Sequence, residues 1–217
     1  MEIINLGENN SIFNHFISEI RNVEIQNDSM RFRRNMERIG EIFSYEISKK
    51  MNYTNTKITT PLGDSWENII SEKPVLATIL RAGLPLHQGF LNYFDDAENS
   101  FISAHRKYKT DGDFEIIIEY MASPDITNKS VILCDPMLAS GLSMKLALES
   151  LLNKGNPKHI HLVSVISSSE GINFINKNIN FQNCTLWIGS EDKEMTKELY
   201  IVPGIGDAGD LSFGKKK

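Results

Sequence analysis

The segment from residue 131 to residue 144, VILCDPMLASGLSM, ends an apolar run on an acid and continues with small and hydroxyl residues. Asp135 could accept hydrogen bonds from ribose hydroxyls, and Ser140 and Ser143 could donate hydrogen bonds to a phosphate. Gly141 lets the backbone turn its N–H groups toward that phosphate, ahead of the positive end of a helix. These residue types indicate a site for a phosphorylated sugar. The same composition also suits an ordinary strand–helix turn, and it matches neither G-x-x-x-x-G-K-[ST] nor G-x-G-x-x-G.

The elements that must position this segment are predicted from short apolar runs that alternate with loop signals and helical segments. The runs cover residues 74–80, 101–106, 130–135, 159–167 and 185–190. Such runs are typical of strands buried on both faces, and helices between them imply right-handed parallel crossovers. The sequence therefore predicts an α/β fold with a mainly parallel central sheet flanked by helices. Ligands of such sheets bind beyond the carboxyl ends of the strands, where the residues from Asp135 onward would lie.

Two helices and a hairpin are expected around these strands. Apolar residues spaced three and four apart predict an amphipathic helix over residues 28–51, capped by Asp28 or Ser29. A second helix follows the loop and ends near Gly155. The Asp-Gly pair within residues 107–121 is a turn signal beside an apolar run, and it predicts a hairpin or arm that projects from the main sheet.

Composition narrows the class of protein. The chain has 217 residues, 41% of them hydrophobic, and we expect one domain over residues 1–217. The net charge of −5 argues against nucleic-acid binding through bulk charge, so a small-molecule ligand fits better. The sequence has no apolar stretch of the ~20 residues that span a bilayer. The first residues, MEIINLGENN, lack the features of a signal peptide, so we expect no membrane association and a cytoplasmic location.

The other candidates for metal or stacking chemistry are expected to be structural. Cys134 and Cys184 lie on apolar runs without the spacing of metal ligands, and we expect both to be buried thiols. His159 and His161 share one face of a predicted strand but lack a third ligand. We expect the two tryptophans to pack within the protein rather than to stack on nucleic-acid bases.

Several motifs, taken together and in order, resemble the uracil phosphoribosyltransferase family of type I phosphoribosyltransferases. They are RIGEIFSYE (38–46), LRAGL (80–84), SAHRKY (103–108), DPMLASGLS (135–143) and YIVPGIGDAGDLSFG (200–214). The resemblance implies transfer of ribose 5-phosphate from 5-phosphoribosyl 1-diphosphate (PRPP) to N1 of uracil, giving UMP and pyrophosphate in pyrimidine salvage. It also implies a type I phosphoribosyltransferase-like fold with a β-arm and a small C-terminal hood over the base site. Mg²⁺ bound with PRPP and a homodimer or higher homo-oligomer are further expectations.

The resemblance assigns roles to residues at matching positions. Arg81 and Arg106 resemble the arginines that contact PRPP, and the planar fork of a guanidinium suits a diphosphate. Asp207 matches a position beside uracil that also reaches PRPP, so these three are the candidate catalytic residues. The residues that resemble the PRPP loop are Asp135, Pro136, Met137, Leu138, Ala139, Ser140, Gly141, Leu142 and Ser143. Those around uracil are Ile201, Gly206, Asp207 and Ala208. No protein ligand is assigned to the metal.

One departure and two alternative functions stay open. Leu142 stands where the family usually has glycine or another small residue, and it would be strained if the backbone there had a positive φ. With a negative φ its side chain can face the core. One alternative is a phosphoribosyltransferase for another base, such as a purine, which the C-terminal pattern disfavours. The other is a non-catalytic regulatory homologue that senses PRPP or UMP; an RNA-binding role should leave a basic face.

Overall fold

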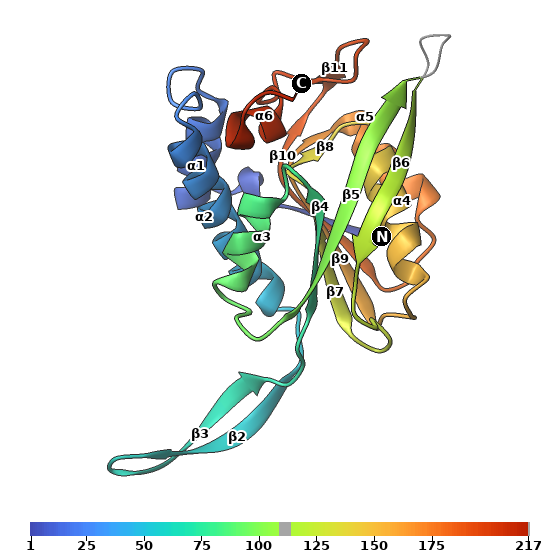
Figure 1. The fold of residues 1–217 in the computed structure, drawn as a ribbon. Helices are drawn as coiled ribbons and strands as arrows, with labels where there is room; N and C mark the ends of the chain where they lie inside the picture. The colour runs from blue at the N-terminus through green and yellow to red at the C-terminus, as the bar shows by residue number, and fades with distance from the viewer. Residues whose placement is uncertain (109–113, 217) are drawn as a thin grey trace.

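The computed structural model describes the backbone of residues 1–108 and 114–216, and the side chains of these residues apart from 105–108 and 114–116. Its centre is a mainly parallel sheet with the strand order β1-β10-β9-β7-β4-β5-β6, in which β8 also pairs with β9 (Figure 1). Only the β5–β6 pair of this sheet is antiparallel among the described residues. The strands are β1 (Glu2–Asn5), β4 (Val75–Leu80), β5 (Glu98–Tyr108), β6 (Phe114–Ala122), β7 (Ser130–Cys134), β8 (Met137–Leu138), β9 (His159–Ser168) and β10 (Cys184–Asp192). The mainly parallel α/β fold is therefore confirmed, and each predicted run forms a strand.

Helices cover both faces of the sheet (Figure 1). The helices are η1 (Leu6–Glu8), α1 (Ile12–Arg21), α2 (Ser29–Ser48), α3 (Leu84–Leu91), α4 (Leu142–Leu152), α5 (Ser169–Asn178) and α6 (Ala208–Phe213). Helix α2 is the long amphipathic helix predicted from the sequence, and the Asp28 side chain caps it by accepting a hydrogen bond from the backbone N–H of Arg31. In Figure 1 helices α1, α2 and α3 lie on one face, and α4 and α5 lie on the other.

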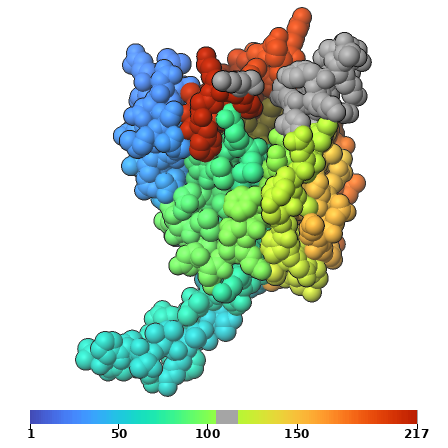
Figure 2. All heavy atoms as spheres, viewed as in Figure 1, coloured from blue at the N-terminus to red at the C-terminus, as the bar shows by residue number. Residues whose placement is uncertain are grey.

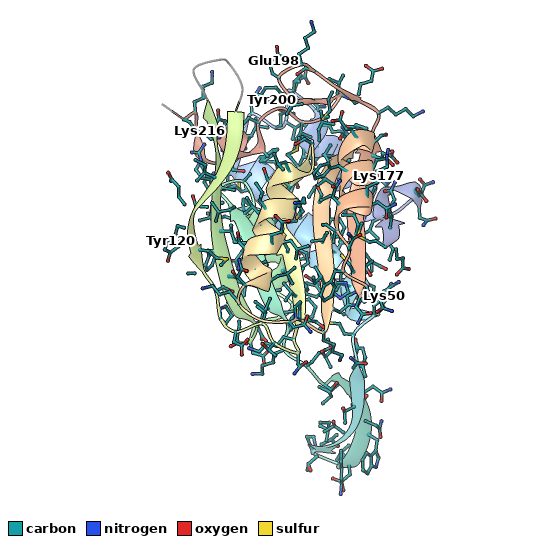
Figure 3. All side chains as sticks on the ribbon, turned by 90° about the vertical axis from the view of Figure 1, so that its right-hand side faces the viewer. Lys50, Tyr120, Lys177, Glu198, Tyr200 and Lys216 are labelled. Carbon is teal, nitrogen blue, oxygen red and sulfur yellow. The ribbon has the colours of Figure 1, made fainter. Side chains whose placement is uncertain are left out.

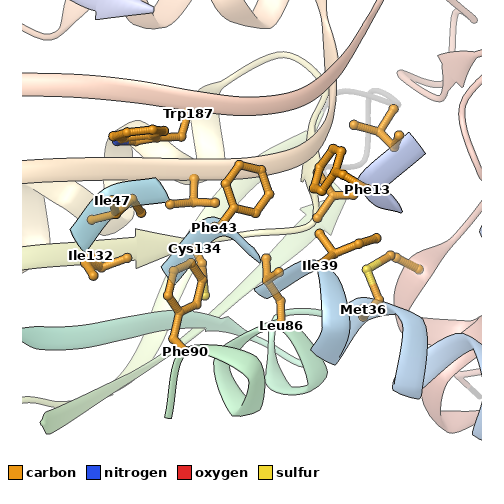
Figure 4. Packing of buried hydrophobic residues seen from close by; sticks show 14 of the residues in the cluster. Phe13, Met36, Ile39, Phe43, Ile47, Leu86, Phe90, Ile132, Cys134 and Trp187 are labelled. Atoms are coloured by element: carbon orange, nitrogen blue, oxygen red, sulfur yellow. The ribbon is translucent and has the colours of Figure 1, made fainter. Parts of the chain in front are cut away.

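Successive side chains of each strand point to opposite faces of the sheet, so the sheet separates two apolar clusters. Leu76 and Ile132 belong to the cluster under α1, α2 and α3, which also contains Phe43 (Figure 4). Their neighbours Val75 and Val131 belong to the cluster under α4 and α5. Burial on both faces explains why these strands read as continuous apolar runs rather than as alternating patterns.

Two hairpins differ in their relation to the sheet. The predicted hairpin of residues 107–121 is confirmed, because β5 and β6 pair antiparallel. This hairpin continues the main sheet at its edge rather than projecting from it. The predicted Asp111-Gly112 turn lies outside the described residues. The projecting arm is a different segment. Strands β2 (Tyr53–Thr60) and β3 (Gly63–Ile70) pair antiparallel and extend away from the body (Figures 1 and 2). The sequence pattern of residues 53–70 did not predict this arm.

The tryptophans have opposite environments. Trp187 on β10 is 2% exposed, as predicted, whereas Trp66 on β3 is 62% exposed. The prediction that Trp66 packs is wrong within this chain. The arm is a single two-stranded sheet, and no other layer of the described chain covers its side chains. Both cysteines are buried free thiols, as predicted.

The histidine pair on β9 has a structural role. The rings of His159 and His161 lie 4.4 Å apart between centroids, and the indole N–H of Trp187 donates to His161 Nδ1 at 3.1 Å. Burial lowers the pKa of His161 to about 3, so the ring stays neutral and can accept this hydrogen bond. Within the described part of the chain, no helix has the length and apolar character needed to cross a membrane.

Trp187→Phe should destabilise the protein by about 1 to 3 kcal/mol, because it leaves His161 Nδ1 buried without a donor and removes buried volume. Urea unfolding at one protein concentration measures the difference. Tyr93→Phe is the control, because Tyr93 is 57% exposed and lies outside the arm, so a change within about 0.5 kcal/mol is expected. Equal effects of the two substitutions would contradict this assignment of the hydrogen bond.

Candidate active site

A cleft of about 970 Å³ lies where several strands end. It is lined by residues 79–82 at the end of β4, by most of the loop from Asp135 to Met144 after β7, and by parts of the segment 199–209. The last segment includes β12 (Ile201–Val202), which pairs antiparallel with β11 (Glu194–Met195) to form a small hood. The fold thus brings together three motifs that lie far apart in the sequence.

Most of the residues that the sequence singled out line this cleft. They are Arg81, Asp135, Met137, Leu138, Ala139, Ser140, Gly141, Ser143, Ile201, Gly206, Asp207 and Ala208. Pro136 does not line the cleft; its carbonyl accepts hydrogen bonds from the backbone N–H groups of Val165 and Ile166 at 3.1 and 2.9 Å, which fastens the loop to β9. Arg106 lies on β5 opposite Ile116, and its side chain is outside the described part of the structure.

The loop before α4 has the backbone geometry of an anion site. Gly141 is the N-cap residue of α4 and has a φ of +81°. As a glycine it provides no side-chain hydrogen bond to the N–H groups of the helix. A Cβ at Gly141 would lie 2.8 Å from Phe174 Cδ1. The hydroxyl of Ser168 donates to the carbonyl of Ala139 at 2.6 Å and holds the other side of the loop. The backbone N–H of Leu142 makes only a long hydrogen bond to Ser140 Oγ, at 3.5 Å, so the N–H groups that begin α4 can turn to a phosphate.

The positive φ falls on Gly141 and not on Leu142. Leu142 is the first residue of α4 and has the helical backbone that any side chain tolerates. Its side chain is partly buried, and it does not line the cleft. The departure from the usual small residue at this position therefore brings no backbone strain.

Asp135 lies at the start of the loop, partly buried at the edge of the cleft. Burial raises the pKa of Asp135 to about 7, and the hydrogen bond that its carboxylate accepts from the backbone N–H of Met137, at 3.4 Å, only partly offsets this. Near neutral pH the carboxyl therefore exists in both protonation states. A ligand whose hydroxyls donate to Asp135 would favour the ionised state.

Arg81 and Asp207 are linked through helix α6. The Arg81 guanidinium contacts Asp210 Oδ1 at 2.9 Å and the carbonyl of Gly214 at 3.3 Å. Asp207 is the N-cap of α6, and its side chain accepts a hydrogen bond from the backbone N–H of Asp210 at 2.9 Å. One short helix therefore holds the arginine side of the cleft and the C-terminal side together.

The structure adds lining residues that the sequence analysis did not assign. Leu199 and Tyr200 come from the hood, and Lys216 comes from the C-terminal tail. Figure 3 shows Tyr200 and Lys216 at the same end of the molecule. Lys216 Nζ lies 4.0 Å from Asp207 Oδ2, which gives the cleft a second positive group. The sequence does not predict that Lys216 lines the cleft, because only the fold shows which residues lie near the C-terminal segment.

Protein ligands for a resident metal ion are not apparent at this site. Among the residues that the structure describes, no three or more His, Cys, Asp or Glu side chains gather to hold a metal ion. A metal that enters with a diphosphate would need few protein ligands, since Mg²⁺ keeps several waters and binds substrate phosphates.

A mainly parallel sheet with a phosphate-suited loop beyond its carboxyl ends makes the chain a type I phosphoribosyltransferase in fold. A hypoxanthine phosphoribosyltransferase from Staphylococcus aureus is similar, with a TM-score of 0.50 over 74% of each chain at 14% identity. A protein from Aquifex aeolicus is similar with a TM-score of 0.86, over 98% of each chain at 27% identity. The family model of uracil phosphoribosyltransferase matches residues 8–215, and the chain belongs to that family.

Relatives in this family are similar over nearly the whole chain. A uracil phosphoribosyltransferase of Porphyromonas gingivalis is 56% identical over 216 residues, covering 100% of both chains. One of Methanococcus vannielii is 36% identical over 92% of this chain and 84% of its own length.

Asp135→Asn should change stability in a pH-dependent way. The folded state binds the Asp135 proton more tightly than the unfolded state, so ionisation costs stability as the pH rises from about 4 to about 7. The variant should therefore be more stable than the parent by about 1 to 3 kcal/mol at about pH 8, and the difference should shrink toward pH 4.

Urea unfolding over this pH range measures the difference. Asp125→Asn is the control, because hydrogen bonds from Thr127 lower the pKa of that exposed carboxyl and no gain is expected at high pH. A less stable Asp135→Asn protein at pH 8 would refute the raised pKa of Asp135.

Proposed function

We propose that this protein, as one domain over residues 1–217, transfers ribose 5-phosphate from PRPP to N1 of uracil, producing UMP and pyrophosphate in pyrimidine salvage. The observation that carries the proposal is the shared cleft, in which the loop after β7 faces the C-terminal segment 199–209. Family membership and the relatives named above support the choice of uracil. They give no support to a non-catalytic PRPP-sensing protein, and the likeness to a purine enzyme extends to the fold alone.

The reaction exchanges two bonds at C1 of the ribose. The C1–O bond to diphosphate breaks with its electron pair, the bond from uracil N1 to C1 forms, and the N1 proton is released. Positive charge develops on the sugar, as in glycoside cleavage, and no enzyme nucleophile is required. The protein must align N1 with C1 and stabilise the leaving diphosphate, so positioning and electrostatics supply the rate.

Residues of the cleft divide this work. The backbone N–H groups at the start of α4 hold the 5-phosphate, and Asp135 accepts hydrogen bonds from the ribose hydroxyls. Arg81 stays charged as the diphosphate departs, and PRPP replaces part of its contact with Asp210. Mg²⁺ that accompanies the diphosphate would neutralise part of its charge and would need few protein ligands, because substrate oxygens and water would hold it.

The C-terminal segment selects the base. Main-chain groups around Gly206 and Ala208 can approach a flat ring and form hydrogen bonds to the edge of uracil. Cytosine presents a different pattern of donors and acceptors and would leave buried groups unpaired. Asp207 borders both the base and the diphosphate, and its hydrogen bond from Asp210 keeps it oriented.

We also propose that the protein forms a homodimer or higher homo-oligomer in the cytoplasm, where buried free thiols remain reduced. The arm supports self-association. Its side chains include Leu62, 100% exposed, and Trp66, 62% exposed, together with Tyr53 and Ile69. An isolated two-stranded hairpin is marginally stable in water, so a second copy of the chain that covers this apolar surface would stabilise it.

The activity is tested with radiolabelled uracil, PRPP and Mg²⁺, with adenine, guanine and hypoxanthine as competing bases. We expect equal amounts of UMP and pyrophosphate and little inhibition by the purines. Binding of PRPP without product, or preferential use of a purine, would overturn the proposed function.

Arg81→Ala should lower kcat/KM for PRPP about 100-fold, because the leaving diphosphate loses its fixed positive partner. The KM for uracil should change less than about threefold. Arg34→Ala is the matched control, since Arg34 pairs with Glu37 on α2 away from the cleft. Unchanged PRPP kinetics in a folded Arg81→Ala protein would remove Arg81 from the site.

Replacing Leu62 and Trp66 with serine should raise the dissociation constant of the oligomer about tenfold or more, as measured by analytical ultracentrifugation. Tyr120→Ser, which alters an exposed aromatic residue on β6, is the control. A parent protein that is monomeric at micromolar concentration would contradict the oligomer, and an unchanged constant in the double variant would remove the arm from the interface.

A further inference from the structure

The C-terminal segment of the cleft is held from outside by an arginine of the N-terminal helix. Arg21 is the last residue of α1, and its guanidinium makes four hydrogen bonds. Nη2 donates to Asp192 Oδ1 at 2.8 Å and to Ser190 Oγ at 2.9 Å. Nη1 donates to Asp192 Oδ2 at 2.9 Å and to the carbonyl of Gly204 at 3.0 Å. Arg21 and these three partners do not line the cleft.

Gly204 is fixed through both of its main-chain polar groups. While its carbonyl accepts from Arg21, its N–H donates to Asp192 Oδ2 at 2.9 Å. Gly204 has φ of +58°, and a Cβ there would lie 2.2 Å from the carbonyl oxygen of Ile201, so the chain turns back tightly at this residue. Ile201 before the turn and Gly206 after it both line the cleft. The place of Gly204 therefore sets the path of the segment that faces the base.

Burial makes this network sensitive to the loss of one partner. Asp192 is 6% exposed, and the side chain of Arg21 is 22% exposed. A carboxylate at that depth needs its positive partner, and the planar fork of arginine supplies paired donors that lysine cannot reproduce. Removing the guanidinium would leave Asp192 unpaired and free the Gly204 carbonyl at once.

We propose that Arg21 is a positioning residue for the base-binding segment and acts through Asp192 and Gly204. The identity of the base rests on the proposed function, whereas the mechanical link between α1 and residues 201–208 does not. Arg21 touches neither substrate. Its loss should therefore affect the site for uracil more than the site for PRPP, which is formed mainly by β4 and by the loop after β7.

The kinetic test compares Arg21→Ala with Arg31→Ala. Arg31 is the matched control. It lies on α2, and its Nε donates to Oε2 of Glu19 at 2.9 Å, so like Arg21 it forms an ion pair that involves α1. The hydrogen bonds described for Arg31 do not reach the C-terminal segment. Arg21→Ala should raise the KM for uracil about tenfold or more and change the KM for PRPP less than about threefold. Arg31→Ala should leave both values near those of the parent. Equal changes in both KM values, or equal behaviour of the two variants, would overturn the positioning role.

A second readout does not depend on catalysis. Hydrogen–deuterium exchange of peptides covering residues 201–208 should be faster in Arg21→Ala than in the parent and in Arg31→Ala. If the parent makes no UMP, the proposed function fails while this measurement still tests the link. Unchanged exchange in Arg21→Ala would refute it.

A conservative variant covers the case in which Arg21→Ala does not fold. Arg21→Lys keeps the charge but cannot make all four hydrogen bonds, so it should raise the KM for uracil about threefold and accelerate exchange of the same peptides. Parental values of both quantities in Arg21→Lys would show that the charge suffices and that the fork does not position the segment.

Discussion

The parallel register of β4 and β7 is the constraint on which the site depends. Thr78 lies opposite Cys134 in this pair, so both strands end at the same edge of the sheet. Arg81 and Asp135 are the first residues after these strands, and they reach one cleft because their strands run in the same direction. A shift of this register would separate the group suited to diphosphate from the group suited to ribose. The two apolar clusters stabilise the register, since they bury both faces of the strands.

The described positive groups of the cleft have partners of opposite charge within the protein. Arg81 is paired with Asp210, Lys216 lies near Asp207, and burial makes Asp135 easy to protonate. In the proposed reaction, PRPP exchanges these internal contacts for contacts to its diphosphate and ribose. Helix α6 is central to this exchange because Asp210 lies on it and Asp207 caps its N-terminus. Each positive group named here therefore has an acidic partner within the protein.

The sequence predicted the parts of the fold whose signals are local. Continuous apolar runs predicted the strands, and spacing by three and four predicted α2. The arm was missed because its exposed strands contain no continuous apolar run, and Trp66 was wrongly expected to pack within the chain because the arm itself was not predicted. Arg21 could not be found from sequence, since its partner Asp192 is 171 residues away and lies in no recognised motif. The role of Leu142 depended on which residue takes the positive φ, and only the backbone shows that Gly141 does.

The central claim is that one cleft binds the phosphate and ribose at the loop after β7 and the base at residues 201–208. A crystal structure of the protein with UMP tests it most directly. We expect the 5-phosphate at the backbone N–H groups that begin α4, the ribose hydroxyls at Asp135, and the uracil ring against the segment that Arg21 holds. UMP bound elsewhere, or bound with its base directed away from residues 201–208, would refute this arrangement of the site.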